Sequence, residues 1–429
     1  MNGDITADAV PLTFGDHYVL RLAAGVADES QMHFGFGVRL PGAPPGPGEL
    51  CELIAKKVAV QAPALGYRLV GEGRRARWEP DPAFDPAYHV EYHRLPRGSD
   101  VHQAVMNAMA VRPLSRERPL WSLLVLYGHA DDEHVLCYRA HHAFQDGMGA
   151  ISAIRALTGD QTLPFPGTGT GTGTGTARAA RPGTGTGAGQ RRALADLLRL
   201  SGAPPRWFSS CATSTPGRRL HVAGLDVEPF HDIARATGAS VAQIAIALVT
   251  GALRSWNPQA RPDGGRDMVV ALPVALLGLG RHTALGNHTG LLPVTLPCAE
   301  PSAIARLQQV VAQTTLQRIS DARHSARALY RVPAALAVPL LRLLSPLART
   351  GRGRQLNVSA VRMPRILPGA GEIFAVPPLA PGVAGMVVIV HAGAVVSFSG
   401  VFDARVSRPG ELLGLLRPAL TELHAAATR

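Results

Sequence analysis

The sequence predicts a mixed α/β fold, an α+β sandwich in two halves with a site between them. At 429 residues the chain is longer than one compact core normally holds, which suggests two domains of roughly 200 residues each. Its 46% hydrophobic and 17% charged residues are typical of a globular protein with a large core. Residues 166–190 are rich in Gly and Thr and predict a flexible linker, because glycine is costly to order and nothing there can pack. We therefore expect one subdomain at residues 1–165 and a second at 191–429.

Strand and helix patterns occur in similar proportion on both sides of this linker. The first half has five such segments: strands at 31–40, 121–128 and 134–140, and helices at 48–61 and 101–114. The second half has six: helices at 228–238, 240–256 and 408–427, strands at 267–276 and 289–297, and a hairpin at 385–402. Ser240 is a suitable N-cap for the helix that follows it.

The apolar segment 332–348 predicts a packed helix broken by prolines, although it has the composition to lie on a bilayer instead. It contains Arg342, and no run of about 18 uninterrupted apolar residues occurs in the chain. The N-terminal residues are polar and acidic, unlike a signal peptide. We therefore expect a cytoplasmic protein, either soluble or peripheral to the inner face of the membrane.

The net charge of +12 comes almost entirely from arginine, since Lys56 and Lys57 are the only lysines. The arginines are scattered and not interleaved with aromatic residues, so we expect no nucleic-acid partner. Attraction to anionic lipid or to the phosphates of a cofactor remains open. The four cysteines are far apart and form no CxxC pair, which argues against disulfides and zinc clusters: Cys51, Cys137, Cys211 and Cys298.

The segment "YRAHHAFQDGMGA", residues 138–150, carries the chemistry. A strand leads directly into His141 and His142, and neighbouring side chains of a strand point to opposite faces. The two histidines therefore cannot easily chelate one ion, and no HxxxH or HExxH spacing surrounds them. We expect no metal site here. The plainer alternative is that a histidine here is an ordinary core residue, which is what we would expect of a lone histidine.

Asp146 and Gly147 follow at the start of an apolar helical stretch. Asp146 is placed either to cap this helix or to hold an arginine. Gly147 is expected to leave space where a side chain would crowd a histidine. One imidazole then points into a cavity with its tautomer fixed from behind, which is what a general base requires.

These residues resemble the HHxxxDG signature of the coenzyme A-dependent acyltransferase superfamily, which includes chloramphenicol acetyltransferase and condensation domains. More of the chain resembles the bacterial wax ester synthase/diacylglycerol acyltransferase family. The resemblance covers nearly the whole chain except the linker. It extends to Pro119-Leu120-Trp121, to the segments 78–96 and 285–297 with Asn287, and to C-terminal strands with Asn357 and Asp403.

The resemblance implies two chloramphenicol-acetyltransferase-like subdomains with a tunnel at their interface. It implies that His142 is the general base and that His141, Asp146 and Gly147 support it. The co-substrate would be acyl-CoA or an acyl carrier protein, with no bound cofactor. The acceptor would be a hydroxyl compound such as diacylglycerol or a long-chain alcohol, and transfer would be direct. The absence of a GxSxG motif and of a cysteine beside a histidine agrees with transfer without an acyl-enzyme. A membrane or a lipid droplet is a further expected partner, through peripheral contact.

Two departures from the family pattern favour a divergent acceptor, such as a specialised-metabolite alcohol or amine. Ala242-Gln243 stand where the family has Asn-Asp, and Ser359-Ala360 stand where it has Pro-Gly. They leave open a condensation-like enzyme that uses a carrier-protein donor, and a non-catalytic binding protein that keeps the fold. Trp121 is more typical of a core residue than of a ligand contact, whereas Asn287 fits a site or a turn equally well. Four other histidines are expected to be structural or exposed: His33, His89, His282 and His391.

Overall fold

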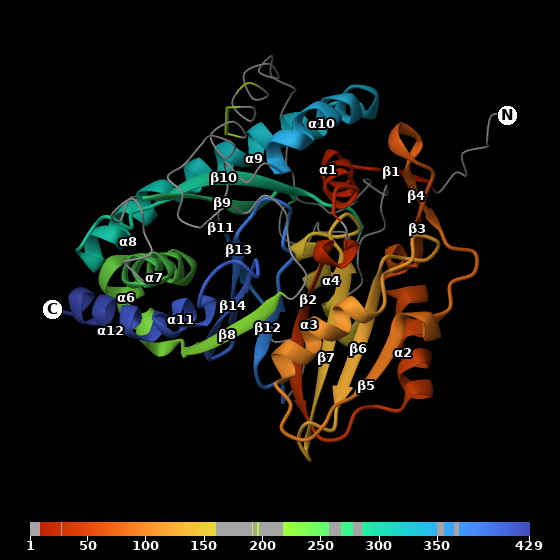
Figure 1. Cartoon of the computed structure of the whole chain (residues 1–429), viewed down its shortest axis with the longest axis horizontal. Helices are drawn as coiled ribbons and strands as arrows, with labels where there is room; N and C mark the ends of the chain where they lie inside the picture. The colour runs from red at the N-terminus through yellow and green to blue at the C-terminus, as the bar shows by residue number, and fades with distance from the viewer. Residues whose placement is uncertain are drawn as a thin grey trace, which may run out of the picture.

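The computed structural model describes most of the chain as two sheets with helices packed against them (Figure 1). The described residues are 9–26, 28–159, 191, 195–196, 218–256, 267–277, 285–349, 356–363 and 369–429. The predicted linker at 166–190, together with Cys211 and His282, lies outside them. The mixed α/β fold class is confirmed.

The first sheet has five strands in the order β12-β2-β7-β6-β5. Their bounds are Ile373–Val376, His33–Pro41, Glu133–His141, Trp121–Tyr127 and Val90–Arg94, respectively. Alternate residues of β7 face opposite sides, as a strand requires. Tyr138 and Ala140 join the core beneath α2 (Pro47–Val60) and α4 (Gly147–Thr158). Val135 and Cys137 join a separate cluster beneath α3 (Val101–Val111), on the face toward the second sheet.

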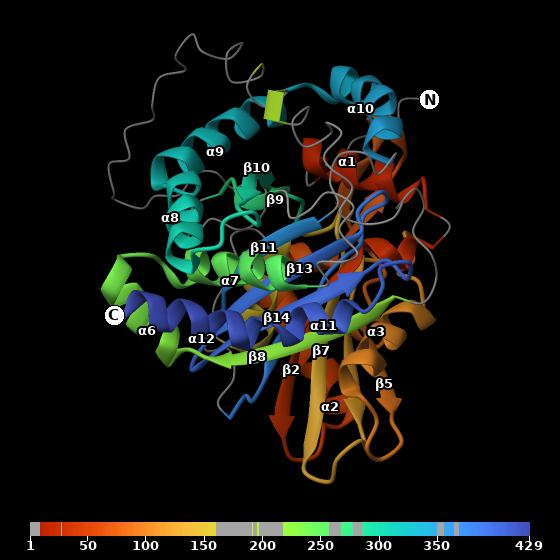
Figure 2. The ribbon, with the colours of Figure 1, turned by 60° about the vertical axis from the view of Figure 1, so that its left-hand side comes forward.

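The second sheet has six strands in the order β10-β9-β11-β13-β14-β8. Their bounds are Thr289–Leu296, Met268–Ala275, Leu356–Arg362, Gly385–Ala392, Val395–Phe402 and Arg219–Asp226. The predicted hairpin is β13 with β14, in antiparallel register. Helices cover one face of this sheet and enclose the largest core cluster (Figure 2). They are α6 (Glu228–Thr237), α7 (Val241–Ser255), α8 (Ala303–Gln313), α11 (Pro409–Gly414) and α12 (Leu416–Ala427).

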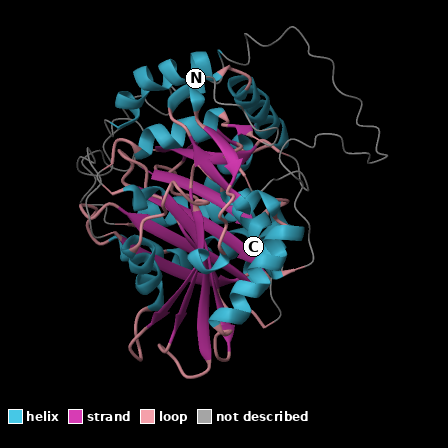
Figure 3. Ribbon diagram, turned by 90° about the vertical axis from the view of Figure 1, so that its right-hand side faces the viewer, coloured by secondary structure: helices cyan, strands magenta, loops and turns pink. Residues whose placement is uncertain are grey.

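Strand β12 belongs to the second half by sequence but pairs with β2 of the first sheet. Phe374 of β12 packs closely over Gly37, where a side chain on residue 37 would overlap its ring. On its other side β12 meets the second sheet, and the Ala375 N–H donates to Ser399 Oγ of β14 at 3.0 Å. The two halves are therefore joined by a strand of the second half that pairs with the first sheet, as well as by side-chain packing. Figure 3 shows the strands of both sheets running through the middle of the molecule, with helices outside them.

Three helices close one end of the molecule: α1 (Phe14–Ala23), α9 (Leu316–Tyr330) and α10 (Ala334–Arg349). The expectation that prolines break the apolar segment 332–348 was wrong, because α10 is one helix that includes Pro339. Pro333 precedes its first turn, where a backbone N–H has no helical partner in any case. Leu341 is buried, whereas Leu343 is 74% exposed, so α10 packs on one side only.

A short three-stranded sheet lies near α1. It comprises β1 (Val10–Pro11), β4 (Arg77–Pro80) and β3 (Tyr67–Val70), in that order. Within the described ranges, no helix is by itself both long and apolar enough to cross a membrane. Only α6 and α7 taken together reach that length and composition, and they meet at a bend of 103°.

Candidate active site

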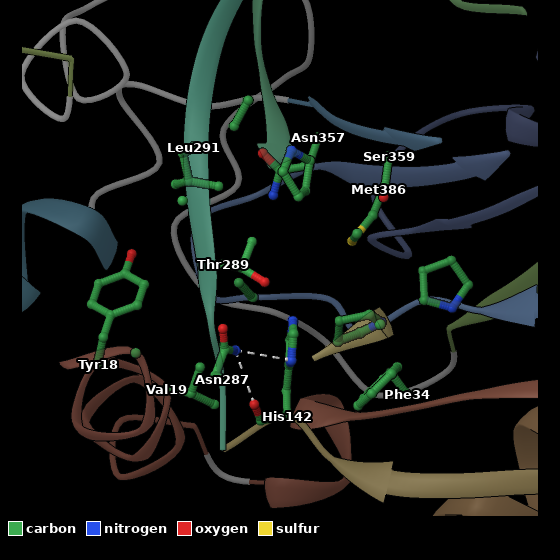
Figure 4. Close-up of a pocket in the computed structure, with 18 of the residues that line it drawn as sticks. Tyr18, Val19, Phe34, His142, Asn287, Thr289, Leu291, Asn357, Ser359 and Met386 are labelled. Carbon is green, nitrogen blue, oxygen red and sulfur yellow. Dashed lines mark hydrogen bonds between the residues drawn. The ribbon is translucent and has the colours of Figure 1, made fainter. Parts of the chain in front are cut away.

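A cavity of about 300 Å³ lies between the two halves and has a predominantly apolar lining. From the first half, α1 contributes Phe14 and Tyr18, and β2 contributes Phe34. From the second half, the strands β9, β10, β11, β12 and β13 and the helices α9 and α10 complete the wall. His142 projects into this cavity from its first-half side (Figure 4).

His142 follows the last residue of β7, where the chain leaves the sheet. Its backbone N–H donates to Met32 O at 2.9 Å, and its ring packs against Phe34 with 4.9 Å between ring centroids. Nδ1 lies 3.1 Å from the carbonyl oxygen of Gln145. A carbonyl can only accept, so Nδ1 carries the proton and Nε2 keeps its lone pair. Burial lowers the pKa of His142, which favours this neutral form.

Asn287 holds His142 from the second half. Its Nδ2 donates to the backbone oxygen of His142 at 3.1 Å and lies 3.3 Å from His142 Nδ1. Because Nδ1 is already protonated, the backbone oxygen is the acceptor. Gly286, which precedes Asn287, has φ +83° and donates its N–H to Phe144 O at 2.6 Å. The structure thus places Asn287 against the histidine, whereas sequence reasoning had left a site role and a turn role equally open.

Asp146 ties the same two segments together. It is the N-cap of α4, as expected, and its Oδ1 accepts from the Gly149 N–H at 2.8 Å. Its Oδ2 accepts from the His288 N–H at 2.9 Å and contacts Thr289 Oγ1 at 3.2 Å. The alternative that Asp146 holds an arginine is therefore wrong, because backbone and hydroxyl donors of the second half fill its acceptor positions.

Asp16 of α1 is a buried carboxylate that sequence reasoning missed. Its oxygens accept from the N–H groups of Asn287 (2.6 Å), Thr13 (2.9 Å) and the Trp78 indole (3.0 Å). The Thr13 hydroxyl lies 2.7 Å from one of them. Burial raises the pKa of Asp16 against the opposing effect of these hydrogen bonds. The spacing Thr-x-x-Asp is a capping-box pattern that would have located the start of α1, but not the long-range bond to Asn287.

His141 points away from the cavity, as alternation along a strand requires. Its Nδ1 accepts from the Ala143 N–H at 3.1 Å, and its Nε2 lies 3.3 Å from Glu29 Oε1. The hydrogen bond from His141, followed by that from Arg116, holds the pKa of Glu29 at about 2. His141 is therefore the core histidine of the pair. His33, which was expected to be structural or exposed, is buried, and its ring meets the ring of His141 edge-on.

The expectation for Gly147 was partly wrong. A Cβ added there would meet no atom within 4 Å, so a side chain would not crowd the histidine. Gly147 nevertheless lines the cavity, and a side chain at this position would occupy cavity space instead.

The remaining candidates divide between core and cavity. Trp121 is fully buried and stacks on His89, with its indole N–H donating to Leu65 O at 2.8 Å, so both rings are core residues. Asp403 is buried and pairs with Arg405, away from the residues that line the cavity. Asn357, in contrast, is part of the cavity wall.

Ala242 and Gln243 lie at the first turn of α7, outside the cavity lining. Gln243 completes a capping box with Ser240, which confirms the predicted N-cap, and its Nε2 donates to Thr314 Oγ1 at 3.0 Å. These two residues therefore support the start of a helix. Among the described side chains, no group of three or more His, Cys, Asp or Glu is arranged to hold a metal ion.

Comparison with known proteins shows what the chain is similar to. Residues 29–195 match the wax ester synthase/diacylglycerol acyltransferase catalytic domain. A putative diacylglycerol O-acyltransferase of Mycobacterium tuberculosis strain H37Rv is 28% identical over 371 residues, 77% of each chain. A wax ester synthase/diacylglycerol acyltransferase from Marinobacter aquaeolei VT8 superimposes with a TM-score of 0.62 at 20% identity, covering 98% of this chain and 100% of that one. The chain is therefore similar over most of its length to proteins of the wax ester synthase/diacylglycerol acyltransferase family.

The protein is an acyltransferase. It also shares its fold with condensation domains. The condensation domain of monacolin K polyketide synthase has a TM-score of 0.65 at 15% identity, with 98% of each chain covered. A starter condensation domain of rhizomide synthetase, solved with C8-CoA, has a TM-score of 0.66 at 16% identity, covering 99% of this chain and 95% of that one.

Proposed function

We propose that this protein is an acyl-CoA-dependent O-acyltransferase that moves an acyl group from a thioester directly to a hydroxyl acceptor. The acceptor class includes diacylglycerol and long-chain alcohols. The observation that carries the proposal is the placement of His142. Its Nδ1–H is fixed by Gln145 O, while the ring projects into an apolar cavity.

In the proposed reaction, Nε2 of His142 takes the proton of the acceptor hydroxyl as its oxygen attacks the thioester carbonyl carbon. The carbon–sulfur bond of the tetrahedral intermediate then breaks, and Nε2 returns the proton to the departing sulfur. An ester and a free thiol leave, and the histidine is neutral again. The apolar lining suits an acyl chain, and exclusion of water protects the thioester from hydrolysis.

The two halves have separate parts in this proposal. The first, residues 1–165, supplies the base. The second, residues 191–429, fixes it through Asn287 and through the bonds of His288 and Thr289 to Asp146. His141, Asp146 and Gly147 act as supports and do not touch the reacting atoms.

We further propose that α10 makes a peripheral contact with a membrane or lipid droplet. Leu336, Leu340 and Leu343 are spaced along one side of the helix and are 66%, 37% and 74% exposed. Arg331 and Arg342 are exposed nearby, as interaction with anionic lipid favours. Replacing Leu343 with Gln should weaken co-sedimentation with anionic vesicles. The matched variant Leu53→Gln on α2, also exposed, should sediment like the wild type.

The main experiment offers the purified protein acetyl- to palmitoyl-CoA with diacylglycerol, hexadecanol, short alcohols and amines. Products are identified by mass spectrometry. The variant His142→Ala should lower the rate by roughly 10²–10⁴-fold. His324→Ala, on the exposed side of α9, serves as the matched control. If folded wild type gives no product with any CoA thioester, the CoA-dependent proposal fails. Carrier-protein thioesters would then test the condensation-like alternative.

A further inference from the structure

At the first residue of β10, one side chain bonds both backbone groups that face away from the sheet. In the part of the chain that the structure describes, β10 is an edge strand with β9 on one side only. His288 O accepts from the Leu276 N–H on that side, so the N–H and the carbonyl of Thr289 point to the open side. There the Tyr330 hydroxyl donates to Thr289 O at 3.0 Å and accepts from the Thr289 N–H at 3.2 Å. The hydroxyl therefore takes the place of a neighbouring strand.

A single hydroxyl can make both bonds only while it keeps its proton. Burial, followed by the charges of Asp16 and Asp146, raises the pKa of Tyr330, so the hydroxyl is protonated at neutral pH. The Tyr330 ring lies beside two others, with centroid distances of 6.1 Å to Phe14 of α1 and 6.3 Å to His288. The hydroxyl therefore has a fixed place at the C-terminal end of α9.

The first turn of α1 fits against this arrangement because residue 15 is glycine. A Cβ added to Gly15 would overlap the Tyr330 hydroxyl and would lie 2.6 Å from the carbonyl oxygen of Asn287. Real Cβ atoms are essentially never found so close to another heavy atom, so an alanine at this position would force its neighbours to move. Three parts of the chain thus meet here: α1, the residues that lead into β10, and the end of α9.

The segment that Tyr330 anchors also holds the candidate base. Asn287 Nδ2 donates to His142 O at 3.1 Å, and Thr289 Oγ1 contacts Asp146 at 3.2 Å. On one side this segment therefore bonds the loop of the base, and on the other side it bonds Tyr330. Without the Tyr330 hydroxyl the segment would be held less tightly, and so would Asn287.

We propose that Tyr330 is a positioning residue: its hydroxyl fixes residues 287–289, and these hold His142 in place for proton transfer. This inference rests on the proposed function, because it concerns the base of that reaction. Tyr330 lines the cavity, but Thr289 occupies its hydroxyl, so it acts through Asn287 and not on the reacting atoms. The expected consequence of losing the hydroxyl is a slower chemical step with unchanged substrate binding.

The test removes the hydroxyl alone, in Tyr330→Phe, and uses the CoA thioester and acceptor that wild type prefers. We expect kcat to fall about tenfold, the effect of one lost hydrogen bond, with each KM within about twofold of wild type. Tyr92→Phe is the matched control, because its hydroxyl donates to Pro45 O at 2.6 Å, away from the cavity lining. Its kcat should not change. Urea unfolding of each variant gives the folded fraction to which kcat is referred.

Gly15→Ala tests the same contact from α1. Overlap of the new methyl group with Tyr330 and Asn287 should displace the segment before β10 and lower kcat by more than about tenfold. Gly48→Ala is the matched control. Gly48 is also the second residue of its helix, and a Cβ added there meets no atom within 4 Å, so its kcat should stay at the wild-type value.

The pH profile separates positioning from a general loss of structure. Burial is the main cause that lowers the pKa of His142, and the charges that act on it, Asp146 and His141, are the same in wild type and variant. If the segment before β10 loosens, water reaches the ring and the effect of burial weakens. The rising limb of kcat/KM in Tyr330→Phe should therefore move up toward the ordinary histidine value of 6.5.

An unchanged kcat in folded Tyr330→Phe would overturn the inference, and so would an equal loss in Tyr92→Phe. A higher KM with unchanged kcat would place the hydroxyl against a substrate, which also refutes a positioning role. A rising limb that stays at the wild-type pH would mean that the surroundings of His142 do not depend on Tyr330. Wild type that acylates no acceptor would instead refute the proposed function.

Discussion

The buried carboxylate of Asp16 gives the sharpest test of how the two halves position the base. Replacing it with Asn keeps the shape of the side chain but leaves one acceptor oxygen where there were two. In the wild type, Oδ1 accepts from the Asn287 N–H and the Thr13 hydroxyl, and Oδ2 accepts from the N–H groups of Thr13 and Trp78. An amide NH₂ in the place of Oδ2 faces two groups that can only donate, whereas in the place of Oδ1 it faces one such group, the Asn287 N–H, beside a hydroxyl that can accept.

The size of the effect follows from these contacts. The favoured orientation keeps the amide oxygen in the place of Oδ2, so the Asn287 N–H is the group that loses its acceptor. One hydrogen bond to a charged group, contributing about 1.5–3 kcal/mol, is then lost, and the bonds from Thr13 and Trp78 become bonds to a neutral acceptor. A neutral amide also avoids the cost of burying a charge, so we expect a loss of about 2 kcal/mol. This is a large share of the roughly 5–15 kcal/mol that stabilises a typical folded protein.

Urea unfolding at neutral pH measures this loss as a shift of the midpoint at constant slope. Because the segment around Asn287 would loosen, kcat should also fall more than KM rises. Asp131→Asn, at an exposed surface ion pair with Arg97, is the matched control and should change neither property. A loss of stability below about 1 kcal/mol for Asp16→Asn, with normal kcat, would show that Asp16 does not anchor the site.

Three other predictions follow from the same contacts. Because burial lowers the pKa of His142, the rising limb of kcat/KM against pH should lie below 6.5, and a limb at or above 6.5 would contradict the assigned neutral base. The pKa of Glu29 is about 2 in the folded protein, against an ordinary 4.5, so its carboxylate stabilises the fold above 4.5 and loses this effect as the pH falls toward 2. The difference in urea midpoint between wild type and Glu29→Gln should therefore shrink over that range; a constant difference would refute the pairing. Arg139→Ala leaves Glu91 without its buried partner at 2.7 Å and should cost about 3–5 kcal/mol in urea unfolding, whereas a loss under 1 kcal/mol would mean that water replaces the arginine.

The sequence was informative where a feature depends on residues close together in the chain. Strand β7 runs into the two histidines, and Asp146 caps the helix that follows, because both features are determined within a dozen residues. The opposite orientations of His141 and His142 follow from the same strand geometry. Local pattern was therefore sufficient to predict that one imidazole points into a cavity, whereas the choice of His142 as the candidate base came from the family resemblance.

Features that depend on distant residues could not be predicted in this way. Nothing in the spacing of Asp16 indicates that it will bond the backbone of Asn287, 271 positions later. The two hydrogen bonds between Tyr330 and the backbone of Thr289, 41 positions apart, are likewise a property of the assembled fold. Local rules predict that Pro339 breaks α10, but the helix continues through it. Proline removes one helical hydrogen bond, and packing of α10 on α1 offsets that loss.

The position of β12 has a consequence for how the chain is made. The edge of β2 that pairs with Ile373–Val376 has no partner until those residues leave the ribosome. At 5–20 residues per second, β2 and β7 would wait roughly 10–50 seconds for this last strand. During that time an open strand edge is available to other chains. Shortened forms that stop before residue 373 should therefore aggregate, even though they contain the whole HHxxxDG segment.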